Sequence, residues 1–247
     1  MKLNKSENMD VPHGNSVVWR YMNNWKFEQL LDSSSIYFPN AQKLSDQYEV
    51  SIPKSVITQK KQELELSGLS ENELKIELER FYWQHDPIKE RVLINCWSVN
   101  PYESYALWKI YLGGERNGIA IKSTVARLSK ALSIGGDLYP EEYFMGKVKY
   151  QKHLTQDQLN RFNIILTKKP YYDFEKELRL FLIANDNAPY QINEGRTVQV
   201  KLDMLINKIY ISPFAEPDYK EFVFNELTKT GLNNIDYLVK DSDIEDK

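Results

Sequence analysis

Apolar and polar side chains alternate along the segment Tyr172–Ile183, which predicts a strand. Because successive side chains of a strand point to opposite faces, its leucines share one face while Glu175, Glu177 and Arg179 share the other. On that second face the guanidinium is close enough to hold one carboxylate while the other carboxylate faces a ligand. The alternative is a solvated strand edge, which alternating charges keep soluble. The pattern therefore indicates either a binding pocket or a charged edge.

The remaining hydrophobic pattern predicts strands and helices that do not alternate regularly, which favours an α+β fold. Lys54–Arg91 is rich in Glu, Lys, Gln and Leu and is broken near Ser67-Gly68, so it predicts two helices. The other predicted strands are 17–22, 36–38, 92–97, 118–122, 147–151, 198–202 and 208–212, and the other predicted helices are 25–31, 102–112, 124–132, 155–168 and 218–230.

We expect a single α+β domain that spans residues 1–247. Its core comprises about 17–53 and 92–240, and a helical insertion occupies about 54–91.

Composition narrows the class of protein. Aromatic residues make up 13% of the 247 residues, which excludes a disordered chain. The formal net charge is -3 and no stretch approaches 18 consecutive apolar residues, so we expect no membrane partner and no broad nucleic-acid-binding field. The polar start predicts no signal peptide, and the single cysteine, Cys96, fits a reducing cytoplasm. The three histidines lack metal-ligand spacing, so we predict no metal.

Polar residues also lie at the mouths of other predicted strands. Arg20 and Ser98 occur there, as do Glu175 and Glu177. If these strands are neighbours, the site offers a fixed cation, a small hydroxyl and a carboxylate, which suit a phosphorylated sugar ligand. The alternatives are a surface ion pair for Arg20 and a strand-end turn for Ser98.

Two further groups of charged residues are candidates for binding. The loop Leu44–Glu49 carries Asp46 and Glu49, and loops on a rigid scaffold often hold ligand groups, although a plain surface loop is the alternative. Several lysines could form a local basic patch for RNA or another nucleic acid, and a solvated face is the alternative. These lysines are Lys147, Lys149, Lys152, Lys168 and Lys169.

The order of motifs resembles a broad bacterial family of domains of unknown function. The resemblance covers roughly residues 17 to 215. It indicates membership of that family and no particular activity, because the family carries no assigned activity. The matching pieces are Arg20-Tyr21, Phe27 to Leu31, Ile36 to Phe38, Asp46 to Glu49, Cys96 to Ser98, Trp108 to Tyr111, Gly118 to Ile121 and Glu175 to Arg179.

More loosely, the chain is similar to the ADP-ribosyltransferases. Arg-class members order their site as an arginine on an early strand, a serine of a central strand and then Glu-x-Glu. Arg20, Ser98, and Glu175 with Glu177 follow that order. The resemblance implies a split-sheet core and NAD as co-substrate.

The same resemblance implies roles for the matching residues. Glu177 would stabilise the positive charge that builds on the ribose, and Glu175 would orient the acceptor or act as its general base. Arg20 would hold the NAD phosphate or ribose, and Ser98 would shape the wall around the nicotinamide ribose.

Further contacts complete this hypothesis. Tyr21 or Tyr37 would stack on nicotinamide, and Arg179 would support the NAD site. Asp46, Lys168 and Lys169 are the residues expected to contact the acceptor.

The leading functional hypothesis is an NAD-dependent mono-ADP-ribosyltransferase that modifies RNA, DNA or protein. Such an enzyme would be a bacterial toxin or anti-phage defence effector, and an antitoxin or other neutralising protein would be its partner. Two alternatives stay open. One is a non-catalytic interaction module in which Glu175 and Arg179 form a structural ion pair. The other is a magnesium-dependent nuclease that uses Asp46, Glu49, Glu175 and Glu177.

Overall fold

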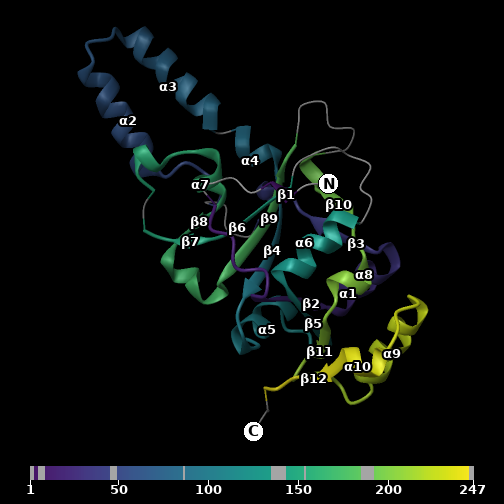
Figure 1. The fold of residues 1–247 in the computed structure, drawn as a ribbon. Helices are drawn as coiled ribbons and strands as arrows, with labels where there is room; N and C mark the ends of the chain where they lie inside the picture. Colours follow the sequence, from purple (N-terminus) through teal and green to yellow (C-terminus); the bar gives the residue numbers. More distant parts are fainter. Residues whose placement is uncertain are drawn as a thin grey trace.

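The computed structural model describes residues 3–4, 9–44, 49–85, 87–134, 143–152, 154–184 and 192–244. Within these ranges the fold is mixed α+β, as the sequence predicts, and is built on a sheet with the strand order β1-β6-β9-β4-β2-β5-β11-β12 (Figure 1). The pairs β1–β6 and β11–β12 are parallel and the other pairs are antiparallel. The strands are β1 (Leu3–Asn4), β2 (Val17–Asn23), β4 (Val92–Val99), β5 (Gly118–Thr124), β6 (Tyr143–Lys147), β9 (Glu177–Ile183), β11 (Lys208–Ile211) and β12 (Val239–Asp241).

Two small strand pairs and several helices complete the described part of the fold. β3 (Ser35–Phe38) pairs with β10 (Arg196–Gln199), and β7 (Lys149–Tyr150) pairs with β8 (Thr167–Lys168). The α-helices are α1 (Asn24–Ser33), α2 (Lys54–Leu66), α3 (Glu71–His85), α4 (Pro87–Arg91), α5 (Tyr105–Leu112), α6 (Val125–Ile134), α7 (Arg161–Ile165), α8 (Leu202–Leu205), α9 (Tyr219–Lys229) and α10 (Ile235–Leu238). The 3₁₀ helices are η1 (Ala41–Lys43), η2 (Gln156–Gln158), η3 (Pro170–Glu175) and η4 (Ile192–Glu194).

The two faces of the sheet are covered differently. The largest hydrophobic cluster lies on one face, where α1, α6, α8, α9 and the β3–β10 pair contribute side chains. The other face carries two separate clusters. One joins β4, β6 and β9 to α7 and to the first turn of α2, and the other joins β2, β5 and β11 to α5. The boundary between these two clusters falls at the β2–β4 junction, in the middle of the sheet.

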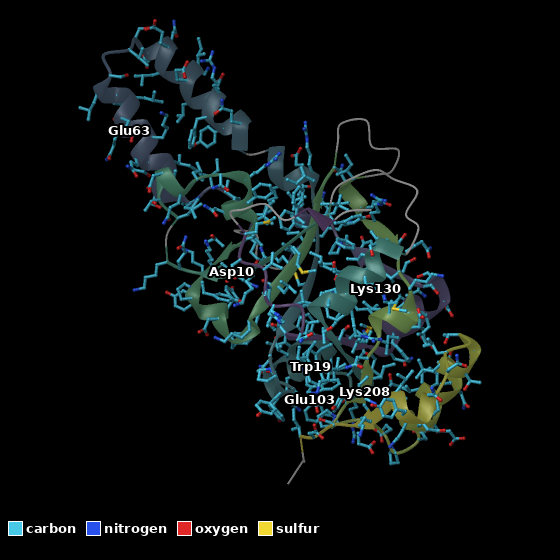
Figure 2. All side chains as sticks on the ribbon, viewed as in Figure 1. Asp10, Trp19, Glu63, Glu103, Lys130 and Lys208 are labelled. Atoms are coloured by element: carbon cyan, nitrogen blue, oxygen red, sulfur yellow. The ribbon has the colours of Figure 1, made fainter. Side chains whose placement is uncertain are left out.

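The predicted helical insertion forms an arm of two helices. α2 and α3 stand away from the sheet in Figure 1, and Figure 2 places Glu63 of α2 far from Trp19 in the body of the protein. The arm is nevertheless anchored, because Val56 of α2 and Phe81 of α3 are buried in the cluster that covers β4 and β9. The structure confirms the predicted break, since α2 ends at Leu66 and α3 begins at Glu71.

Two predicted elements, the strand 172–183 and the helix 155–168, differ from the structure. The predicted strand 172–183 is a strand only from Glu177 onward, because η3 occupies 170–175 and Lys176 adopts a left-handed conformation with φ 45°. The predicted helix 155–168 is divided into η2, α7 and β8. Asn160 restarts the helix there, since its side chain accepts hydrogen bonds from the backbone N–H groups of Phe162 (3.0 Å) and Asn163 (2.9 Å).

The sequence pattern also missed β6 and extended other strands too far. β6 is buried along Tyr143–Gly146, so it lacks the alternation that identifies a half-exposed strand. The predicted strand 147–151 is reduced to β7, and the predicted strand 198–202 ends earlier because Leu202 begins α8. None of the helices in the described ranges is both long enough and apolar enough to cross a membrane.

Candidate active site at a fork in the sheet

The central sheet divides between β2 and β4. These strands pair only at Val18 with Val99 and at Trp19 with Ser98. In contrast, β2 pairs with β5 along its full length, and β4 pairs with β9 from Val92 to Ser98. The two strands therefore diverge from Arg20 onward, which leaves a fork.

A cavity of about 260 Å³ lies at this fork. Its walls come from β2, β4 and α5, from the segment that carries Lys168, and from the junction between η3 and β9. It contains Arg20, Ser98, Glu175 and Glu177, so residues far apart in the sequence meet in one cavity. The full lining is Trp19, Arg20, Tyr21, Lys26, Pro39, Leu44, Glu49, Ile94, Asn95, Cys96, Trp97, Ser98, Leu107, Ile110, Tyr111, Lys168, Glu175 and Glu177.

Arg20 bridges the fork. Its guanidinium donates a hydrogen bond of 2.7 Å to the backbone carbonyl of Cys96 and lies 6.0 Å from the ring centroid of Trp97. Burial lowers the pKa of Arg20 from its ordinary value. No carboxylate of the described residues lies within 4.0 Å of this guanidinium, so its remaining N–H donors are available to the oxygens of a ligand.

Ser98 lies on β4 directly opposite Glu177 on β9. Its buried hydroxyl donates a hydrogen bond of 2.7 Å to the backbone carbonyl of Glu175, and the backbone N–H of Val99 donates one of 2.8 Å to the carbonyl of Lys176. β4 therefore holds the turn between η3 and β9 in place. Because Lys176 is left-handed, the two glutamates do not follow strand alternation, and yet both line the cavity.

Lys168 connects the carboxylates of the cavity. Its ammonium lies 2.8 Å from Glu175, 3.4 Å from Glu49 and 3.9 Å from Glu177, and its side chain is 8% exposed. Arg179 binds the same cluster from behind, through a 2.8 Å contact with Glu177 and an ion pair with Glu49. Three carboxylates and two cations thus form one buried network.

The two glutamates of the cavity differ electrostatically. Burial raises the pKa of the Glu175 carboxyl above its ordinary value, and the neighbouring Lys168 offsets this only in part. Burial acts in the same direction on Glu177, but Arg179 and Lys168 outweigh it and hold the pKa of Glu177 below its ordinary value. Lys168 has a raised pKa, because the carboxylates of Glu177, Glu49 and Glu175 outweigh the effect of its burial.

Aromatic side chains form another part of the cavity wall. Tyr21 and Tyr111 stack with a centroid distance of 6.3 Å and an interplanar angle of 13°, and Trp108 packs edge-on against Tyr21 at 5.0 Å. The Tyr21 hydroxyl accepts a hydrogen bond of 2.8 Å from the backbone N–H of Ser104, at the start of α5. Burial raises the pKa of both tyrosines, so both are neutral phenols. The wall is therefore flat, apolar and fixed to α5.

Some predicted site residues do not line this cavity. Tyr37 is 45% exposed on β3, and its hydroxyl donates to the backbone carbonyl of Glu194. Arg179 is fully buried, and it donates to the backbone carbonyl of Ile165 (2.6 Å) as well as to its two carboxylates. Arg179 therefore holds Glu177 in place and does not itself line the cavity.

The lysines expected to form one basic surface patch lie in different environments. Lys168 is buried among carboxylates instead of belonging to a surface patch, and Lys147 pairs with Asp10 at 3.6 Å. Lys169 is exposed, and its ammonium donates to the backbone carbonyl of Lys152 at 3.2 Å. Asp46 lies outside the described residues.

Sequence reasoning missed three members of the site. Glu49 was considered as a loop residue or a magnesium ligand and not as part of this network, but it is 7% exposed and binds Arg179. Tyr111 was named within the Trp108 to Tyr111 motif, with no role in the site, and it lines the cavity. Cys96 also lines it, and burial together with Glu177 raises the pKa of its thiol well above the ordinary value, which makes the thiol a poor nucleophile. The Trp-x-x-Tyr spacing was the available signal for Tyr111, whereas nothing in the sequence indicates the burial of Glu49.

Within the described ranges, no group of three or more His, Cys, Asp or Glu side chains is arranged to hold a metal ion. Comparison of the chain with protein-family models, with curated proteins and with solved structures found no match.

Proposed function

We propose that this protein is an NAD-dependent mono-ADP-ribosyltransferase and that the fork cavity binds the nicotinamide ribose of NAD. The observation that carries the proposal is the meeting of Arg20, Ser98, Glu175 and Glu177 around one cavity. An ionised carboxylate, a second carboxyl with a raised pKa, a guanidinium with free donors and an aromatic wall are the groups that this chemistry needs.

The reaction breaks the bond between C1′ of the ribose and the nicotinamide nitrogen. The bonding electron pair leaves with nicotinamide, which becomes neutral, and the ribose carries positive charge in the transition state. An acceptor O–H or N–H group then forms a bond to C1′ and loses its proton. NAD and the acceptor thus give ADP-ribosyl acceptor, nicotinamide and one proton.

Glu177 and Glu175 have different roles in this reaction. Glu177 remains ionised because Arg179 and Lys168 lower its pKa, so it supplies a fixed negative charge near the developing positive charge. Glu175 has a raised pKa, which makes it the better base for the acceptor proton. Lys168 binds one of its oxygens and thereby orients the carboxylate.

The remaining residues bind and orient NAD. Arg20 offers its free N–H donors to ribose or phosphate oxygens, and Tyr111 with Tyr21 provides a flat surface for the nicotinamide ring. The volume of about 260 Å³ is below the roughly 300–1,000 Å³ of ligand pockets in general, so the cavity suits the nicotinamide ribose end and not the whole dinucleotide. The adenosine end therefore extends beyond the fork.

The proposal extends to the biological setting. The acceptor is a macromolecule, RNA, DNA or protein, and the protein acts in the cytoplasm as a bacterial toxin or anti-phage effector with a neutralising partner.

The two rival functions are less well supported. A non-catalytic module does not need an open cavity lined by ionisable groups, and a magnesium nuclease needs carboxylates that Lys168 and Arg179 already neutralise here.

Incubation of the pure protein and cell extract with radiolabelled NAD tests this function. The extract is then separated into RNA, DNA and protein, and the label in each fraction is measured. We expect label in one fraction with wild type and with Glu71→Gln, an exposed glutamate of the arm, and none with Glu177→Gln. Equal labelling by all three proteins, or no labelling by any of them, would contradict the proposal.

A further inference from the structure

A second cavity adjoins the first. Its volume is about 440 Å³, and Glu49 and Lys168 line both cavities, so these two side chains form the partition between them. The second cavity lies between the start of α2 and the chain on either side of α7. Its charged lining residues are Glu49, Lys54, Lys152, Lys168 and Lys169.

Positive charge dominates the second cavity. Four lysines line it against one glutamate, in a chain whose formal net charge is -3. The glutamate, Glu49, is already committed to Arg179 and Lys168. In the described part of the chain no carboxylate lies within 4.0 Å of the ammonium groups of Lys54, Lys152 and Lys169. Among the described residues these three ammonium groups thus have no carboxylate partner, and Lys169 donates only to the backbone carbonyl of Lys152.

The start of α2 adds donors of a second kind. Pro53 is its N-cap and offers no side-chain hydrogen bond to the first turn. Pro53, Lys54 and Ser55 all line the cavity, so the N-terminal end of a 13-residue helix, where backbone N–H groups lack helical partners, lies at its wall. The positive end of the helix dipole and the lysines favour the same kind of ligand.

We propose that the second cavity is a phosphate-binding subsite that continues the fork cavity past Lys168. Two sources of phosphate fit this chemistry: the pyrophosphate of NAD, which the small fork cavity leaves outside, and the phosphodiester backbone of a nucleic-acid acceptor. Which of these two phosphates binds is a question that rests on the proposed transfer reaction. The binding of phosphate in the second cavity does not rest on it.

The double variant Lys152→Glu/Lys169→Glu tests the subsite. Its matched control is Lys130→Glu/Lys240→Glu, which changes the net charge equally at exposed lysines that do not line the cavity. Binding of inorganic pyrophosphate is measured by calorimetry with no NAD present, so the result is independent of any transferase activity. We expect about a tenfold or larger loss of affinity in the cavity variant and little change in the control. Equal pyrophosphate affinity in both variants, or no binding by wild type, would overturn the proposal.

Two further measurements show whether the bound phosphate belongs to NAD or to a nucleic-acid acceptor. A single-stranded RNA of about 12 nucleotides is titrated by fluorescence anisotropy across salt concentrations, and the KM for NAD is measured by nicotinamide release. For an acceptor site, the cavity variant loses RNA affinity, the slope of log K against log salt falls by about 1.4, and the KM for NAD is unchanged. For a donor site, the KM for NAD rises and RNA binding is unchanged. Either pattern supports the subsite, while RNA binding and KM values equal to those of the control would contradict it.

Discussion

Arg20 on β2 donates a hydrogen bond of 2.7 Å to the backbone carbonyl of Cys96 on β4, at the point where these neighbouring strands have stopped pairing. A side-chain hydrogen bond thus links the two diverging strands where the backbone hydrogen bonds between them have ended. Because the bond uses one N–H group, the rest of the guanidinium faces the cavity that the divergence creates. Structure and binding depend on the same residue.

Replacing Arg20 with Lys separates these two roles. An ammonium group offers no planar fork of donors, so it cannot reach the Cys96 carbonyl and also bind paired ligand oxygens. We expect the affinity for NAD to fall about tenfold or more, with a loss of stability near 1 kcal/mol. Calorimetry with NAD and chemical denaturation measure the two effects. An unchanged affinity would show that Arg20 does not contact the ligand.

Neutralising the two cavity glutamates should change stability in opposite directions. The pKa of Glu177 in the folded protein lies below its ordinary 4.5, so its ionisation stabilises the fold above that pH, and this contribution is lost as the pH falls through the lowered pKa. The pKa of Glu175 is raised, so its ionised form costs stability near neutral pH, and that cost disappears as the pH falls through the raised pKa.

Near neutral pH we therefore expect Glu177→Gln to destabilise the protein by about 3 kcal/mol, since it removes the 2.8 Å ion pair of the fully buried Arg179. Glu175→Gln should leave the stability unchanged or raise it slightly. Urea denaturation of both variants beside wild type tests the contrast. A large loss of stability in Glu175→Gln would contradict the assigned direction of its pKa.

The raised pKa of Glu175 also predicts a pH dependence of the transfer reaction. A general base works only when deprotonated, so kcat/KM should fall as the pH is lowered through the raised pKa of this carboxyl. Glu175→Gln should lower the transfer rate by about 10²–10⁴-fold and remove this acidic limb from the profile. Persistence of the same limb in the variant would assign it to another group.

Tyr111 offers a test of the aromatic wall. Tyr111→Phe keeps the ring that stacks with Tyr21, whereas Tyr111→Ala removes it. We expect the KM for NAD to rise about fivefold in the alanine variant and to change little in the phenylalanine variant, because ring contact is worth about 1 kcal/mol. If both variants raised the KM equally, the hydroxyl would be the binding group.

The sequence predicted the α+β class, the strand that carries Arg20, the strand 92–97 that continues through Ser98, and the two-helix arm. The strands have a clear apolar pattern because they lie within the core, and the arm was predicted from its helix-favouring composition and the break at Ser67-Gly68. The strand 172–183 was predicted too long, since its first half also contains alternating residues. The left-handed Lys176 that ends η3 carries no sequence signal of its own, because left-handed residues are usually glycine or asparagine.

The charged network was not predictable for a different reason. Glu49, Lys168 and Arg179 come from three separate segments, and each reads as a surface charge until its partners are known. Burial of such groups depends on long-range pairing of β9 with β4 and on the placement of the loop after α7. Local patterns contain no information about that pairing.

NAD turnover by pure wild-type protein beside Glu177→Gln, followed as release of nicotinamide, tests the proposed transferase activity, and circular dichroism confirms that Glu177→Gln is folded. We expect nicotinamide release by wild type and a loss of at least about 10²-fold in the variant. Equal rates for the two proteins, or no release and no NAD binding by wild type, would contradict it.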